Sequence, residues 1–424
     1  MKKLNLFYYK TKNNLIISFE KENIFGELIT EKEASNNTNL SIYFLINTEN
    51  KINRRTFIVN TVSDLFIKRD SLNLLKKDTS KDSLIPSWLL NLIKKDKIIA
   101  LNKSYPSWKK VLEDKIITKN KKWNINIVGL GDVGGTLITG LRLLGNDSID
   151  KIGIYDKNIN KIKRFEYECN QICYPSLDTP TPKICEINED NLFDCDMFVF
   201  CVSVGVPKIG NEKEDVRLVQ FKGNSKIVSY YAKLARERNF NGLFCIVSDP
   251  VDLLCKVAFT ESNKDSSEKL DYKGLAPEQI RGYGLGVMNA RASYYALKDE
   301  KTKNYIKEGR AFGPHGEGLI IANSIKNYNK DLSDYLTDKT KTANLEIRDL
   351  GFKPYIAPAL SSGTLSILAT IKSQWHYSTT FLNGTFMGIR NKFIKGTTKL
   401  ENYENMPEDL FEKLEKTFDY LKSY

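Results

Sequence analysis

Long apolar runs are missing from this sequence, and this absence bears on where the protein resides. No uninterrupted apolar stretch approaches the roughly 20 residues that a membrane-spanning helix needs. The opening MKKLNLFYYKTKNN has too short an apolar segment for a secretory signal. We therefore expect a cytoplasmic protein without a membrane partner.

Histidine is scarce, with two residues among 424, and the seven cysteines contain no CxxC pair. The cysteines lie between Cys169 and Cys255, and their odd number does not resemble a disulfide framework. Cys169, Cys173 and Cys185 fall close together, but no histidine is near them in the sequence. We expect reduced structural thiols and no metal site.

A clustered basic stripe is also missing, although the formal net charge is +12. The lysines are scattered through the chain, which favours a solvated surface over a nucleic-acid-binding face. We therefore expect no nucleic-acid partner. The length of 424 residues predicts two or three domains.

Residues 1–118 are predicted to form a small α+β domain of unknown role. Short aromatic and β-branched runs predict strands, and segments with Pro and Ser at their starts predict helices or helix-turn pieces. The strand runs are LNLFYY, NLIISFE, SIYFLIN and RRTFIVN, and the helical pieces are IPSWLLNLIKKDKIIAL and YPSWKKVLEDK. The charged segment 116–122 is the expected linker.

Residues 119–273 have a different texture, typical of a doubly wound parallel α/β domain. The runs INIVGLG, KIGIYD, MFVFCVSVG and GLFCIVSD are apolar almost without alternation, as in strands buried on both faces. Segments of helical period separate them, among them TLITGLRLLG and KIKRFEYECNQI. Residues 274–424 have a mixed pattern and are predicted to form an α+β substrate or catalytic domain.

The stretch Gly129–Gly134, GLGDVG, follows the first of these strands and opens a helix. In a dinucleotide site, Gly129 permits the tight turn, Gly131 lets the backbone approach a pyrophosphate, and Gly134 lets the helix pack closely. The free amides at the helix start then face the phosphates. These features predict a Rossmann fold that binds a dinucleotide.

Asp156 ends the next strand, 22 residues after Gly134. A carboxylate there accepts the ribose hydroxyls and repels a 2′-phosphate, so NAD is the expected cofactor, although Lys157 weakens the repulsion. The full set of expected cofactor-binding residues is Gly129, Gly131, Asp132, Val133, Gly134, Asp156, Val202, Ser203 and Ser248.

Residues 123–395 resemble the lactate/malate dehydrogenase family. The matching pieces occur in order: GLGDVGG, YDKN, CVSVGVPKIG, DVRLVQFKGN, VSDPVDLLCK, GLGVMNAR, GPHGEG, SSGTLSIL and HYSTTFLNG. The resemblance implies that His315 exchanges the proton of a substrate hydroxyl while hydride moves to or from nicotinamide. It also implies that Arg291 holds a substrate carboxylate through two parallel hydrogen bonds. Homo-oligomerisation is implied by the resemblance alone.

Three departures from the family pattern concern the catalytic residues. Met288 replaces the aspartate that orients the histidine, and Asp249 replaces an asparagine that contacts nicotinamide and substrate. Asp215 stands where a mobile loop carries the carbonyl-polarising arginine, with Arg217 as the nearest substitute. Asp249 or Glu317 can take over the orientation of His315, and we favour Asp249.

The leading hypothesis is an NAD-dependent dehydrogenase that acts on a carboxylate-bearing 2-hydroxy or 2-oxo substrate. An NAD-dependent glycoside hydrolase is an alternative, but its metal-binding Cys and His are absent from VSDPVDLLCK and GVMNAR. A non-catalytic NAD-binding regulator or scaffold is a second alternative, because the family's orienting aspartate and its carbonyl-polarising arginine are both replaced. Retention of His315 and Arg291 favours the enzyme.

Overall fold

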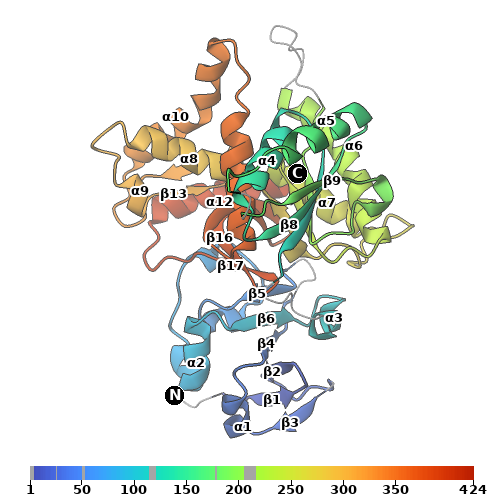
Figure 1. Cartoon of the computed structure of the whole chain (residues 1–424). Coiled ribbons are helices and arrows are strands. Elements are labelled where there is room, and N and C mark those ends of the chain that lie inside the picture. Colours follow the sequence, from blue (N-terminus) through green and yellow to red (C-terminus); the bar gives the residue numbers. More distant parts are fainter. Residues whose placement is uncertain (1–3, 25, 50–52, 114–120, 177–178, 205–215) are drawn as a thin grey trace. The chain divides into compact units, whose positions relative to one another are not determined.

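The computed structural model describes residues 4–24, 26–49, 53–113, 121–176, 179–204 and 216–424, without the side chains of 216–219 (Figure 1). The chain divides into two compact units. The first comprises Met1–Ile117, Leu382–Gly384 and Phe393–Met406, and the second comprises Thr118–Phe381, Thr385–Lys392 and Pro407–Tyr424. Among the described residues, no helix is both long and apolar enough to cross a membrane.

The first unit is built on a mixed sheet with the strand order β3-β1-β2-β4-β6-β5. β2, β4 and β6 are parallel, whereas β1 and β5 run antiparallel to their neighbours. The elements are β1 (Phe7–Lys10), β2 (Asn14–Ser18), β3 (Glu27–Ile29), α1 (Glu31–Asn36), β4 (Ser41–Ile46), β5 (Thr56–Ile58), α2 (Ser87–Lys94), β6 (Ile98–Asn102) and α3 (Trp108–Glu113). Short 3-10 turns lie at Val62–Phe66, Leu72–Leu75 and Asp82–Leu84. Apolar side chains are buried on both faces of this sheet.

One helical prediction in this unit was wrong in part. The segment IPSWLLNLIKKDKIIAL forms a helix only over α2, and its last residues form the buried strand β6. Asp96, at φ +55°, follows the end of α2, and Ile98 and Ile99 then pair with β4 and β5. β-branched side chains fit a buried strand well, so pairing outweighed the helical pattern.

A distant segment of the chain completes the first unit. β17 (Thr397–Leu400) belongs to it, and the Thr56 Oγ1 hydroxyl donates to Thr397 Oγ1 at 2.9 Å. The Asn60 amide donates to the Leu400 carbonyl at 3.0 Å, and Lys77 pairs with Glu404 at 2.7 Å. The unit is therefore discontinuous in sequence.

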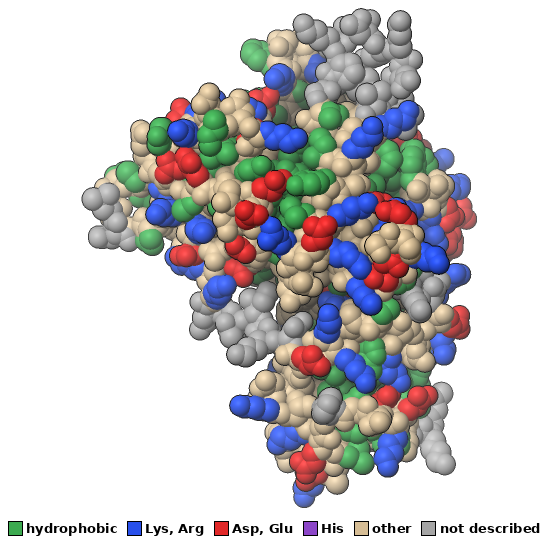
Figure 2. Space-filling model, turned by 90° about the vertical axis from the view of Figure 1, so that its right-hand side faces the viewer, with side chains coloured by type: hydrophobic (Ala, Val, Ile, Leu, Met, Phe, Trp, Pro, Cys, Tyr) green, Lys and Arg blue, Asp and Glu red, His purple; other side chains and the backbone are tan. Residues whose placement is uncertain are grey.

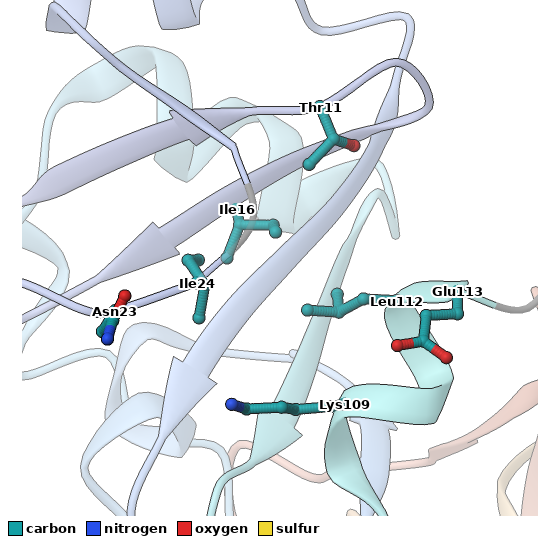
Figure 3. A pocket seen from close by; sticks show the side chains of 7 residues that line it. All are labelled: Thr11, Ile16, Asn23, Ile24, Lys109, Leu112 and Glu113. Carbon is teal, nitrogen blue, oxygen red and sulfur yellow. The ribbon is translucent and has the colours of Figure 1, made fainter.

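A cavity of about 500 Å³ lies within the first unit, between β2 and α3 (Figure 3). Ile16, Ile24 and Leu112 form apolar walls, while Lys109 and Glu113 lie one helical turn apart on α3. The Asn14 amide donates to the Leu112 carbonyl at 2.9 Å and so attaches the end of α3 to β2. The cavity thus has apolar walls and exposed charged side chains.

Most strands of the second unit lie in one sheet in the order β16-β15-β12-β11-β10-β7-β8-β9. Its strands are β7 (Trp123–Val128), β8 (Ile149–Tyr155), β9 (Lys183–Glu186), β10 (Met197–Phe200), β11 (Leu243–Ile246), β12 (Ile280–Gly282), β15 (His376–Leu382) and β16 (Thr385–Ile394). β7 to β12 are parallel and follow the doubly wound order 3-2-1-4-5-6, with β7 as strand 1. The predicted Rossmann fold is confirmed. β7 and β10 flank the switch point of the sheet, where such folds bind ligands.

In the Rossmann part of the second unit, helices alternate with most of the strands, whereas later helices also follow one another directly. The helices of the unit are α4 (Asp132–Leu144), α5 (Ile159–Asn170), α6 (Val216–Glu237), α7 (Val251–Ser262), α8 (Leu285–Ala296), α9 (Tyr305–Glu308), α10 (Lys330–Asp349), α11 (Leu365–Ile371) and α12 (Glu408–Ser423), with a π-helical turn η6 at Pro358–Thr364 and 3-10 turns at Glu189–Asn191 and Pro277–Gln279. Phe198 and Phe200 of β10 pack with α6 and α7, and Met197 and Val199, which alternate with them, are buried as well. Burial of both faces explains the unbroken apolar runs of these strands.

The rest of the second unit mixes helices with antiparallel strands, as predicted for the α+β part. β15 joins the sheet antiparallel to β12 through Gly282 and Thr379. A separate hairpin of β13 (Arg310–Phe312) and β14 (Ile320–Ala322) has FGPHGEGL at its turn. On the face that Figure 2 shows, basic side chains are interspersed with acidic ones.

Candidate active site

The glycine loop between β7 and α4 is shaped by close backbone contacts. Gly129 has φ +96°, and a Cβ there would lie 2.7 Å from the Val202 nitrogen. A Cβ on Gly134 would lie 2.0 Å from the Gly129 carbonyl oxygen. By contrast, a Cβ on Gly131 would have no atom within 4 Å, and Gly131 caps the N-terminus of α4. The loop is therefore tightly packed at Gly129 and Gly134 and open at Gly131, and this shape fits a pyrophosphate.

Asp156 lies at the end of β8 beside this loop. Its Oδ2 accepts a hydrogen bond from the Leu130 amide at 2.8 Å, and its Oδ1 accepts one from the Asn158 amide at 2.9 Å. The Lys161 ammonium is 3.8 Å from Oδ2. These contacts fix a carboxylate at the position where the ribose of a bound dinucleotide is expected.

The loops after β10 and β11 are joined by hydrogen bonds. The Ser248 hydroxyl donates to the Val202 carbonyl at 2.7 Å, and the exposed Ser203 donates to its neighbour Val204. The buried Asn224 of α6 accepts from the Val204 amide at 2.8 Å and donates to the Asp249 carbonyl at 2.7 Å. The sequence analysis did not select Asn224. The available signal was an amide side chain within a helix that packs on the core.

His315 lies on the turn of the β13–β14 hairpin, where glycines let the backbone bend. Gly313 and Gly318 have φ +86° and +83°, which favours glycine. The Gly313 amide donates to the Gly388 carbonyl at 2.9 Å, and Thr417 donates to the Gly318 carbonyl at 2.9 Å. The turn is thus attached to β16 on one side and to α12 on the other.

Asp249 contacts the His315 ring. The Nδ1 atom of His315 lies 3.1 Å from the Asp249 Oδ1 atom, and the two residues are 66 positions apart in the sequence. The His315 side chain is 16% exposed and that of Asp249 48% exposed, so the pair lies at the edge of solvent. A Cβ on Gly284 would lie 3.0 Å from the His315 Cβ, which places the ring close to the start of α8.

Arg291 of α8 lies near the same carboxylate. Burial lowers the pKa of the Arg291 guanidinium, and the negative charge of Asp249 opposes this effect. Its Nη1 atom also approaches the Met288 sulfur at 3.9 Å. Met288 is buried and carries no acidic group, so Asp249 supplies the negative charge near Arg291.

Asp252 is a second carboxyl near His315, and sequence reasoning did not select it. It is buried in the first turn of α7 and accepts a hydrogen bond from the Thr379 hydroxyl at 2.8 Å. Burial raises the pKa of Asp252 to about 7, and a charge on His315 opposes this rise. The sequence did contain a signal for Asp252 as a site residue. It follows Asp249 by three positions and lies on the buried side of the start of a helix.

The other sequence candidates lie elsewhere. The Glu317 carboxylate pairs with the Lys341 ammonium at 3.0 Å and is exposed. Arg217 is in the first turn of α6, but its side chain lies outside the described part of the chain, as does all of Asp215. Within the described residues, no group of three or more His, Cys, Asp or Glu is arranged to hold a metal ion.

The second histidine, His376, has a different environment. It is buried on β15, where its Nδ1 donates to the Gln374 carbonyl at 2.9 Å. Its Nε2 accepts from the Thr370 and Ser378 hydroxyls at 3.0 and 3.1 Å. Burial lowers the pKa of His376 to about 3, so its ring is neutral at physiological pH and serves the packing of the core.

No family model matches the sequence. Among curated proteins, a malate dehydrogenase of Aliarcobacter butzleri is 25% identical over 62% of this chain and 81% of its own length. An L-lactate dehydrogenase 2 of Staphylococcus aureus is 24% identical over 51% of this chain, but the match spans only 62% of that protein.

Solved structures have the same fold as the chain. A lactate dehydrogenase from a Medee basin deep-sea metagenome library matches 72% of this chain and 98% of its own, with a TM-score of 0.58 and 16% identity. A malate dehydrogenase from Archaeoglobus fulgidus, solved with NADH, matches 71% of this chain and 97% of its own, with a TM-score of 0.56 and 16% identity. In sequence and in fold, the chain is therefore similar to malate and lactate dehydrogenases, which supports the predicted resemblance to that family.

Two departures from the family pattern meet at one place in the structure. The resemblance assigns the position of the family's orienting aspartate to Met288, whose sulfur contacts Arg291. It assigns the position of the family's asparagine to Asp249, whose carboxylate contacts His315. Asp249, in the loop after β11, thus offers His315 a carboxylate in place of the one that the resemblance expects on α8.

Proposed function

We propose that this chain is an NAD-dependent dehydrogenase of the lactate/malate dehydrogenase type, acting on carboxylate-bearing 2-hydroxy or 2-oxo substrates. The contact of 3.1 Å between His315 Nδ1 and Asp249 Oδ1 carries the proposal, because it pairs the family's acid/base residue with a carboxylate. A non-catalytic NAD-binding protein would not need that pair.

The glycine loop and Asp156 support NAD as the cofactor. The open space in front of Gly131 suits a pyrophosphate at the start of α4, and the Asp156 carboxylate suits free ribose hydroxyls better than a 2′-phosphate. Bound NAD would supply the acceptor for a hydride, and NADH the donor in the reverse direction. Ser248 and Asn224 hold the neighbouring loops in position around this part of the site.

His315 would move the proton of the reaction. With the Nδ1 hydrogen donated to Asp249, the other nitrogen, Nε2, remains to accept the proton of a substrate hydroxyl or to return it to a carbonyl. The Asp249 carboxylate fixes the ring tautomer and stabilises the imidazolium that forms when the hydroxyl proton is taken up. The edge position of the pair leaves it accessible to a substrate.

Arg291 would hold the substrate carboxylate. A guanidinium makes two parallel hydrogen bonds to a carboxylate, and partial burial strengthens such a pair. Arg217 remains the proposed substitute for the arginine of the mobile loop. The identity of the 2-oxo acid depends in part on that loop and on Asp215.

The test is the oxidation of NADH, followed by absorbance, with a panel of 2-oxo acids. We expect turnover of at least one acid by the full chain and its loss in His315→Asn. Turnover that persists undiminished in His315→Asn would contradict the proposed mechanism. Binding of NADH without turnover of any acid would favour the non-catalytic alternative.

Homo-oligomerisation and a cytoplasmic location remain predictions for this chain. The mass of the protein in solution, measured by light scattering, tests the first. A mass of one chain across a range of protein concentrations would contradict it.

A further inference from the structure

An ion pair joins the start of α4 to the segment that follows α10. The Lys353 ammonium lies 3.0 Å from the Asp132 carboxylate, and the two residues are 221 positions apart. Asp132 is the first residue of α4 and follows Gly131 of the glycine loop. A positive charge is therefore held beside the proposed pyrophosphate position by a segment outside the glycine motif.

The position of Lys353 follows from the packing of η6 along α4. A Cβ on Gly140 would lie 2.4 Å from the Thr364 hydroxyl oxygen, so the two segments touch closely there. Thr364 donates to the Leu137 carbonyl at 3.4 Å, and a Cβ on Gly363 would lie 2.5 Å from the Leu137 side chain. These contacts hold the end of η6 against the middle of α4, while Lys353 reaches the first residue of the same helix.

η6 is also bonded to the start of α8, the helix that carries Arg291. The Ser362 hydroxyl donates to the Gly284 carbonyl at 2.8 Å and accepts from the Val287 amide at 2.8 Å. A Cβ on Gly286 would lie 2.7 Å from the Ser361 carbonyl oxygen. The segment before α11 is thus fixed to both the dinucleotide helix and the substrate helix.

The charges at this place are unfavourable for a phosphate unless Lys353 takes part. The amides at the start of α4 attract a phosphate. The Asp132 carboxylate lies at the same helix end, and its negative charge repels that phosphate. The side chains of Lys353 and Asp132 are 81% and 50% exposed, and so exposed a pair contributes little to stability. The ammonium can therefore turn to a bound anion at little energetic cost.

We propose that Lys353 is a pyrophosphate-binding residue of the dinucleotide site and that Asp132 holds it in place when no dinucleotide is bound. The assignment rests on the proposed function, because it requires a dinucleotide at the glycine loop. It adds to the site a phosphate contact from outside the Rossmann motif.

The test compares Lys353→Gln and Lys353→Arg with Lys372→Gln in the full chain. Lys372 pairs with Asp147 at 2.9 Å, just beyond the other end of α4, and so provides a control ion pair away from the glycine loop. The dissociation constants of NADH, by fluorescence, and of ADP-ribose, by calorimetry, are measured at low and high salt. For Lys353→Gln we expect both constants to rise roughly three- to tenfold at low salt, and less at high salt. Lys353→Arg and Lys372→Gln should bind like the parent.

Three outcomes decide the assignment. If the parent binds NADH and Lys353→Gln binds it equally well, the role of Lys353 is overturned and the proposed function stands. If the parent binds neither NADH nor ADP-ribose, the proposed function and this assignment both fail. If Asp132→Asn restores the full parental affinity in the Lys353→Gln background, Lys353 only neutralises Asp132, and the phosphate contact is overturned.

Discussion

Thr56 and Thr397, which are 341 positions apart, share a hydrogen bond of 2.9 Å between their hydroxyl oxygens. The bond lies within the first unit, which takes Phe393–Met406 from the C-terminal part of the chain. Deletion of the N-terminal region therefore removes the binding partners of this segment.

We expect a truncated chain of residues 119–424 to be less soluble and to melt at a lower temperature than the full protein. β17 would lose its contacts with β5, and a strand at the edge of a sheet that loses its covering segment promotes aggregation. A second truncation, in which residues 395–406 are replaced by a short Gly-Ser linker, should recover solubility and NADH binding. Equal solubility and melting of the two truncations would contradict this prediction.

Asp249→Asn should lower kcat by roughly 100-fold or more and leave the NADH dissociation constant within about twofold. The amide keeps the shape of Asp249 but cannot stabilise the imidazolium of His315. His315→Asn should have a similar effect, and the double variant should be little worse than either single one, because the two residues act as a unit.

Glu317→Gln provides the matched control for these variants. Glu317 lies on the same turn as His315, and its carboxylate pairs with Lys341. We expect parental kcat for this variant. Loss of activity in Glu317→Gln together with parental activity in Asp249→Asn would make Glu317 the orienting residue.

Arg291→Lys should raise KM for the 2-oxo acid roughly tenfold or more and also slow turnover. A lysine keeps the positive charge but cannot make two parallel hydrogen bonds to one carboxylate. Steady-state kinetics at saturating NADH measures both parameters. An unchanged KM would argue that the substrate carboxylate binds elsewhere.

Asp156 should make the protein bind NADH more tightly than NADPH, because its carboxylate repels a 2′-phosphate. Asp156→Asn keeps an oxygen that can accept from the Leu130 amide, so the loop should persist while the preference falls roughly tenfold. Fluorescence titrations with both nucleotides measure the ratio. Equal or tighter binding of NADPH by the parent would refute the prediction.

Asp252 should make stability fall as pH rises. Its pKa is about 7 in the folded protein and near 4 in the unfolded chain, so the unfolded chain binds fewer protons between these values. The free energy of unfolding therefore decreases from about pH 4 to about pH 7 on account of this group. Asp252→Asn, which can still accept from Thr379, should lack that decrease, whereas the exposed Asp338→Asn should retain it. Parallel pH curves for Asp252→Asn and the parent in denaturant unfolding would contradict the prediction.

Much of the second unit was predictable from local patterns. The apolar runs around Ile125, Ile154 and Phe198 predicted buried parallel strands because both faces of such strands must be covered. Gly129 and Gly134 predicted the turn and the close helix packing, since a Cβ would clash with the backbone at either position. The family resemblance rested on the glycine motif together with later motifs, among them GLGVMNAR and GPHGEG.

Other features depended on contacts between segments that are distant in the sequence. The sequence offered Asp249 and Glu317 as partners of His315 and favoured Asp249, and the folding of the β13–β14 turn toward the loop after β11 brought Asp249 to the His315 Nδ1 atom. Ile98 and Ile99 became a strand because β4 and β5 lie on either side of them. The membership of β17 in the first unit and the approach of Lys353 to Asp132 likewise had no local signal. Side-chain periodicity encodes which face of an element is buried, but the partner that covers it is decided by the packing of the whole chain.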